Sequence, residues 1–152
     1  MPFRDFAADP HQFDLIFLND VFEHLRDPVS VLTTLAAKLK EGGRIFIDTP
    51  KQSWIYPAAK AVSKSLYTKL LRGTVSQAHL QIWSRKAFRV AVQRAGLGVE
   101  KYQEITELTM PVGYYLHNMG IDGAFLKLAA KLAFSSAQLL FRNKIICVLK
   151  RA

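Results

Sequence analysis

The feature that most constrains the fold is a strand–helix–strand pattern within residues 13–50. Phe13 to Leu18 is a short run of aromatic and branched apolar residues, typical of a strand buried on both faces. Asp27-Pro28 then begins a helix, as N-cap and first helical residue, and Gly42-Gly43 predicts where that helix ends. Arg44 to Asp48 is a second apolar strand. A crossover of this length predicts parallel neighbouring strands, and therefore an α/β fold.

Further helices and strands are expected after residue 50. The predicted elements are a basic amphipathic helix, a second helix, a strand, a broad apolar helix and a last strand, at residues 57–72, 84–96, 99–105, 124–142 and 144–149. We therefore expect a single domain over residues 1–152. It would carry a basic helical insertion at 53–80 and an apolar helical insertion at 106–142.

The charge of the chain is unevenly distributed. Residues 1–50 carry five basic and eight acidic side chains, whereas residues 51–94 carry nine basic and none acidic. Such a segment suggests an anionic partner: a lipid head group, a nucleic acid or a phosphorylated substrate. A solvated helix face is the alternative. Nucleic acid is the weaker of these partners, because no RNA- or DNA-binding motif accompanies the charge.

The single cysteine, Cys147, lies in an apolar run and is expected to be a packed core residue. One cysteine cannot form a disulfide within the chain, which fits a reducing compartment. We expect a cytoplasmic protein, either soluble or peripheral to a membrane, because the first dozen residues do not have the pattern of a secretory signal.

Several segments together resemble the second half of the class I S-adenosylmethionine-dependent methyltransferases. Phe13-Asp14-Leu15-Ile16 is similar to the fourth strand of that family. The matching pieces that follow are Glu23-His24-Leu25 with Asp27-Pro28, Leu39 to Gly43 with Ile45 to Pro50, and His79 to Ser84 with Phe88 and Ala95-Gly96-Leu97. The resemblance, with ubiquinone-pathway O-methyltransferases in particular, implies a doubly wound, Rossmann-like sheet with the equivalents of strands four to seven.

The front half of the family pattern has no counterpart before Phe13. In that family the first strand ends in a glycine-rich turn, where only glycine allows the backbone to approach the cofactor closely. The G-x-G of this chain, Gly96-Leu97-Gly98, lies between a helix and a strand. The chain therefore resembles a methyltransferase fragment. We expect residues 13–18 to form an open sheet edge that self-associates or pairs with a complementing chain.

The resemblance also implies roles for residues at the end of the first strand. Leu18 and Asn19 would border the methionine part of S-adenosylmethionine. Asp20, Glu23 and His24 would share one face of a helical turn, where they are similar to the E-x-x-E-H element that holds magnesium in some relatives. His79 would be a further ligand. In other relatives this histidine binds substrate or packs, so both alternatives to a metal stay open.

Methyl transfer needs little machinery, because the sulfonium is already activated. The enzyme aligns the acceptor and, for an oxygen acceptor, removes a proton. His24 and His79 are the candidate bases. We expect methyl transfer to a small-molecule, lipid-like or glycan hydroxyl. The alternative is a non-catalytic domain that binds a partner through its open edge or its basic helix.

Overall fold

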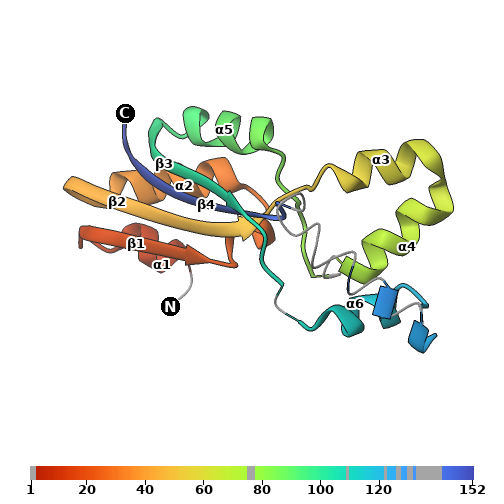
Figure 1. The fold of residues 1–152 in the computed structure, drawn as a ribbon. Coiled ribbons are helices and arrows are strands. Elements are labelled where there is room, and N and C mark those ends of the chain that lie inside the picture. The colour runs from red at the N-terminus through yellow and green to blue at the C-terminus, as the bar shows by residue number, and fades with distance from the viewer. Residues whose placement is uncertain are drawn as a thin grey trace.

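The computed structural model describes residues 3–74, 78–108, 110–121, 123–125, 128–129, 132 and 142–152. These residues form a four-stranded sheet in the order β1-β2-β4-β3 (Figure 1). The strands are β1 (Phe13–Asn19), β2 (Leu39–Pro50), β3 (Leu97–Ile105) and β4 (Lys144–Arg151). β1 runs parallel to β2, and β4 runs antiparallel to both of its neighbours. The predicted α/β class and the parallel strand pair are confirmed.

Two helices, α2 (Pro28–Ala37) and α5 (Arg85–Arg94), cover one face of this sheet (Figure 1). Each begins at a predicted cap: Asp27 accepts a hydrogen bond from the Ser30 amide, and Ser84 accepts one from the Ala87 amide. The core between the layers joins Leu32 and Leu35 of α2, Phe88 and Val92 of α5, and the inward residues Ile45, Ile47, Cys147 and Leu149. Since Cys147 is fully buried, the expected core role of this cysteine is confirmed.

The Gly42-Gly43 pair does not end the first helix, as the sequence predicted. The helix ends at Ala37, and β2 begins two residues later, so both glycines lie inside that strand. The register of β1 on β2 shifts here, and a Cβ on Gly43 would lie 2.9 Å from the carbonyl oxygen of Phe13. Gly42 adopts a φ of +74°. The two glycines therefore allow a β-bulge in β2, where its backbone lies close to the backbone of β1.

The first strand is an edge strand, as predicted, but it is not buried on both faces. Within the described part of the chain its one strand partner is β2. Leu15 and Phe17 are 47% and 63% exposed, on the face opposite α2 and α5. Phe17 contacts Phe46 of β2, while the short helix α1 (Phe3–Ala8) stacks Phe6 on Phe13. An apolar sequence therefore forms this strand without full burial.

The predicted single helix at 57–72 is two helices, α3 (Ile55–Val62) and α4 (Lys64–Thr74). Ser63 between them is extended, with φ −161° and ψ 133°, and its hydroxyl accepts a hydrogen bond from the Leu66 amide. This cap restarts the helix in a new direction. The pair projects from the sheet and contacts α6 (Val112–Asn118) (Figure 1).

The predicted apolar helix at 124–142 lies largely outside the described residues. Its described members are residues 124–125, 128–129, 132 and 142. The last strand and the strand before it are confirmed close to their predicted bounds. Across the described ranges, no helix combines the length and the hydrophobicity needed to span a bilayer.

Candidate functional site

The candidate site lies at the end of the sheet where its parallel strands terminate. β1, β2 and β3 all end there and β4 begins there, because β4 alone runs in the opposite direction. The carboxyl ends of parallel strands are where open α/β sheets bind ligands. This end of the sheet carries six polar residues from distant parts of the chain: Asn19, Asp20, Asp48, Thr49, Glu107 and Lys144.

Glu23 is a buried carboxylate at this end of the sheet. It lies in a single turn of 3-10 helix, Phe22–His24, and it is fully buried. Phe22 anchors the turn by stacking on Trp83, with 4.6 Å between the ring centroids. The hydroxyl of Thr49, from the end of β2, donates a 2.9 Å hydrogen bond to Glu23 Oε2. The other oxygen, Oε1, is buried and has no hydrogen-bond partner.

His79 reaches Glu23 because the segment before α5 docks on the same turn. The amides of Leu80 and Gln81 both donate to the carbonyl oxygen of Glu23, at 3.1 Å. The Gln81 side chain donates to the carbonyl oxygen of Leu25 at 2.8 Å. These backbone contacts hold His79 over the carboxylate, with its side chain 18% exposed.

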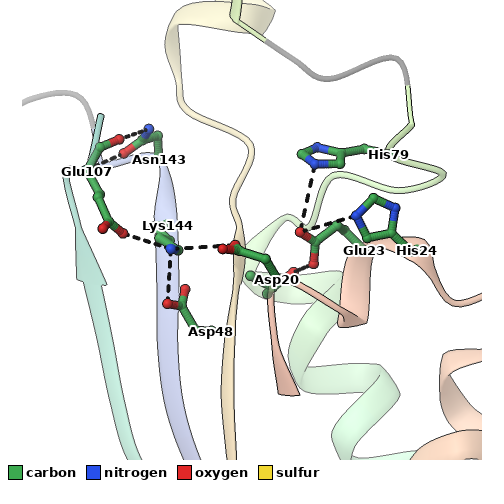
Figure 2. Close-up of polar contacts among 9 residues, drawn as sticks. Asp20, Glu23, His24, Asp48, His79, Glu107, Asn143 and Lys144 are labelled. Carbon is green, nitrogen blue, oxygen red and sulfur yellow. Dashed lines mark hydrogen bonds and ion pairs between the residues drawn. The ribbon is translucent and has the colours of Figure 1, made fainter. Parts of the chain in front are cut away.

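Two imidazole rings face the unpaired oxygen of Glu23 (Figure 2). Nε2 of His24 lies 3.9 Å from Oε1, and Nε2 of His79 lies 3.8 Å from it. Nδ1 of His24 is 3.0 Å from the carbonyl oxygen of Ala78, which fixes a proton on Nδ1 and leaves Nε2 as the acceptor. Ligand atoms of Glu23, His24 and His79 all lie within 4.8 Å of one another.

Asp20 is not part of this group, although the sequence predicted it beside Glu23 and His24. Its φ is +49°, so the chain reverses there, and the helical turn begins only at Phe22. The Asp20 amide donates to the carbonyl oxygen of Asp48 at 3.0 Å, and its carboxylate lies 3.5 Å from the ammonium of Lys144. The predicted metal set of Asp20, Glu23 and His24 is therefore not brought together, and His79 takes the place of Asp20.

Lys144 forms a second polar cluster next to the first (Figure 2). Its ammonium is 2.7 Å from Glu107, 3.0 Å from Asp48 and 3.5 Å from Asp20, and its side chain is 9% exposed. Burial alone would lower the pKa of Lys144, but the bonds to Glu107 and Asp48 outweigh it and raise that pKa. Burial raises the pKa of Asp48, and Lys144 only partly offsets the effect. The ammonium of Lys144 thus links acidic residues at the ends of β1, β2 and β3.

Leu18 and Asn19 occupy the end of β1, where the resemblance placed cofactor contacts. Leu18 is buried, while Asn19 is exposed and is in register with Asp48. Gly96 and Gly98 lie at the turn from α5 into β3, and Gly96 has a φ of +70°. That G-x-G is a helix stop, as expected.

Sequence reasoning missed four polar residues of the candidate site: Thr49, Asp48, Glu107 and Lys144. The signal for Thr49 was its position directly after a buried strand. The signal for Lys144 was a lysine at the start of the apolar strand 144–149. Neither signal names a partner, because the partners are distant in sequence.

Comparison with known proteins identifies the family of the chain. A family model described as a methyltransferase domain matches residues 2–102. The ubiquinone biosynthesis O-methyltransferase of Stutzerimonas stutzeri is 32% identical over 88 residues, which is 53% of this chain and 38% of that protein. A similar enzyme of Xylella fastidiosa is 28% identical over 68% of this chain and 45% of its own length. The chain thus spans less than half the length of these curated relatives.

Solved structures show the same fold. A putative methyltransferase from Bacillus halodurans aligns with a TM-score of 0.57 at 12% identity, covering 96% of this chain and 69% of that one. A geranyl diphosphate methyltransferase, solved in complex with S-adenosylmethionine, aligns with a TM-score of 0.54 at 15% identity, over 96% and 55% of the two chains. With a family model matching two-thirds of its residues, the chain belongs to the methyltransferase-domain family.

Proposed function

We propose that this chain supplies the acceptor side of an S-adenosylmethionine-dependent methyltransferase that acts on a hydroxyl group of a small-molecule, lipid-like or glycan acceptor. The observation that carries the proposal is the cluster of Glu23, His24 and His79 at the carboxyl edge of the sheet. Family membership and the names of the curated relatives support the reaction class.

The chain's own residues fit one part of the cofactor. Bound S-adenosylmethionine supplies a methyl group already activated on sulfur. Leu18 and Asn19, at the end of β1, are the residues that would border its methionine part. In this family a glycine-rich turn holds another part of the cofactor, and the first glycine of these 152 residues is Gly42, which lies after β1. We expect that turn to be contributed by another segment or polypeptide that lies beside the open edge of β1.

On the acceptor side, the two imidazoles would hold and deprotonate the hydroxyl. His24 Nε2 is the available acceptor atom, because Nδ1 is committed to the carbonyl oxygen of Ala78. Glu23 Oε1 lies 3.9 Å from Nε2 of His24 and 3.8 Å from Nε2 of His79, so its negative charge would stabilise an imidazolium formed on either ring. Thr49 fixes the plane of that carboxylate.

A divalent cation also fits this cluster. The fit rests on Glu23 Oε1, a buried oxygen without a hydrogen-bond partner, and on two histidine nitrogens at 3.8 and 3.9 Å from it. Such separations accommodate a cation at about 2.0–2.3 Å from each ligand. Two imidazoles and one carboxylate suit zinc, manganese or iron better than magnesium. The cation would place positive charge beside the acceptor oxygen.

The test of methyl transfer is a chimaera in which the first half of a curated relative precedes Phe13. We expect it to bind S-adenosylmethionine and to methylate phenolic or lipid-like hydroxyls, with His79→Ala and Glu23→Gln lowering transfer at least tenfold. Unchanged transfer in both folded variants would contradict the acceptor-side role. Micromolar binding of the cofactor by residues 1–152 alone would contradict the need for a second segment.

The test of the cation is calorimetry with Mn²⁺, Zn²⁺ and Mg²⁺ in separate titrations. His79→Ala should abolish binding, whereas Asp20→Asn should leave it intact, because Asp20 belongs to the Lys144 cluster. Asparagine also tolerates the positive φ at that position. If wild type binds none of the three ions, the cluster acts as a metal-free base.

A second candidate function is a non-catalytic domain that binds a partner chain. The observation that favours it is β1, which carries exposed Leu15 and Phe17 and has one strand neighbour among the described elements. The chimaera separates the two proposals: a partner-binding domain would fold there without transferring a methyl group.

A further inference from the structure

The helices α3, α4 and α6 form an arm that carries positive charge and no carboxylate. Their sequences contain neither aspartate nor glutamate, while Lys60, Lys64, Lys69 and Arg72 are all exposed. Along the chain, the acids nearest to α3 and α4 are Asp48 and Glu100, and those nearest to α6 are Glu107 and Asp122. In the sheet body, by contrast, Arg44 and Arg85 are paired with acids. Among the described residues no acid pairs with these four basic side chains, although Lys60 also lies over the Tyr67 ring, 5.9 Å from its centroid.

Exposed aliphatic side chains occupy the same part of the arm. Val62, the last residue of α3, is 78% exposed, and Leu66, in the first turn of α4, is 47% exposed. The extended Ser63 lies between them, and Lys60 and Lys64 are exposed in the same short stretch, so residues 60–66 form a corner with both exposed aliphatic and exposed basic side chains. In Figure 1 this corner lies at the far end of the arm from the sheet.

We propose that the corner of residues 60–66, with Lys69 and Arg72 beside it, docks on an anionic phospholipid surface. Lysines attract the negative head groups, and the two aliphatic side chains enter the boundary between head groups and acyl chains. This combination favours lipid over RNA, because phosphate-backbone binding makes no use of exposed valine and leucine. The arm would lie on the bilayer, as its helices are too short to span one.

The proposal does not depend on methyl transfer, and it is tested without cofactor. The full chain is floated with vesicles of phosphatidylcholine alone or with 30% phosphatidylglycerol. We expect binding to the anionic vesicles only, weakening as salt is raised. Charge reversal at Lys60, Lys64 and Arg72 should reduce partitioning at least about a hundredfold, since the loss of each basic residue alone costs roughly fivefold.

The matched control reverses three exposed basic residues of the sheet body, Lys86, Arg94 and Lys101. It changes the net charge equally, so it should reduce flotation far less than the arm variant. Equal losses would show that only net charge matters, and would overturn the docking site.

A second readout reports insertion. Val62→Cys is labelled with an environment-sensitive dye, which is selective because Cys147 is fully buried. We expect a blue shift with anionic vesicles and none with neutral ones. Flotation without a blue shift would overturn the aliphatic contact. Tight binding of single-stranded RNA, abolished by the arm reversal while vesicles stay unbound, would replace the lipid with a nucleic acid.

Discussion

The hydroxyl of Thr49 donates a 2.9 Å hydrogen bond to one oxygen of Glu23, while the other oxygen faces His24 and His79. The end of β2 thus sets the orientation of a carboxylate that belongs to the turn after β1. A buried carboxylate held in this way keeps its free oxygen in a fixed position, which is what either a metal ligand or a partner of two imidazoles requires.

Thr49→Val keeps the shape of the side chain but removes the donor. We expect about 1–2 kcal/mol lower stability, because Glu23 Oε2 would be buried without a partner. Where the wild type binds a cation, its affinity should fall about 10–100-fold. Urea denaturation and metal calorimetry measure the two effects. Thr49→Ser, which retains the hydroxyl, is the control, and equal losses in both variants would contradict an orienting role.

Glu104 should make the stability of the fold pH-dependent below neutrality. Burial would raise its pKa, but hydrogen bonds from Arg85 and Tyr102 and the nearby Lys51 ammonium lower it to about 2. Because this pKa is depressed in the folded state, the stability is present above the unfolded value near 4.5 and is lost as the pH falls toward 2.

The expected loss over that range is on the order of 3 kcal/mol. Glu104→Gln should remove most of this pH dependence between pH 5 and 2, and should lower stability at pH 7. Thermal unfolding at a series of pH values is the measurement, with exposed Glu41→Gln as the control. The same slope in Glu104→Gln as in wild type would refute the assignment.

Gly43 should not tolerate a side chain. Its Cβ would meet three backbone oxygens of Phe13, Lys40 and Asp14 at 2.9–3.3 Å, and backbone cannot yield as a side-chain tip can. We expect Gly43→Ala to cost about 1–3 kcal/mol in urea denaturation. Gly113→Ala is the matched control, because its Cβ meets nothing within 4 Å and it lies in α6. It should be neutral or slightly stabilising. A neutral Gly43→Ala would show that the bulge relaxes.

The open edge of β1 should make the isolated chain self-associate. Phe17 is 63% exposed beside an edge with which none of the other described strands pairs, and a lysine there would oppose edge-to-edge pairing. We expect Phe17→Lys to shift the chain toward monomer in size-exclusion chromatography with light scattering. Val62→Lys, an exposed position outside the sheet, should not. A wild-type monomer with slow amide exchange along residues 13–19 would argue against an open edge.

Sequence patterns located most of the regular elements, because they depend on local signals. Asp27-Pro28 and Ser84 are caps whose partners lie three residues away, and alternation or apolar runs marked all four described strands. The break at Ser63 also had a local signal, a serine able to cap the next helix. The regular spacing of the lysines on either side concealed it.

The errors concern residues whose conformation depends on distant contacts. Gly42-Gly43 has the composition of a helix stop, but the backbone of β1 lies against it. Asp20 has helical spacing to Glu23 and His24, yet Lys144 and the carbonyl oxygen of Asp48 hold it in a left-handed turn. The docking of His79 on Glu23 depends on the backbone N–H groups of Leu80 and Gln81, which every residue type except proline carries. Only the folded chain could reveal it.

The placement of β4 between β2 and β3 has a consequence for the newly made protein. Ile47 pairs with Cys147, and Tyr102 also pairs with Cys147, so both neighbours await a strand that is translated after them. Until residues 144–151 leave the ribosome, β2 and β3 have no strand between them to join the two parts of the sheet. Completion of this sheet is therefore a non-local event, because it waits for a strand that is translated after both of its neighbours.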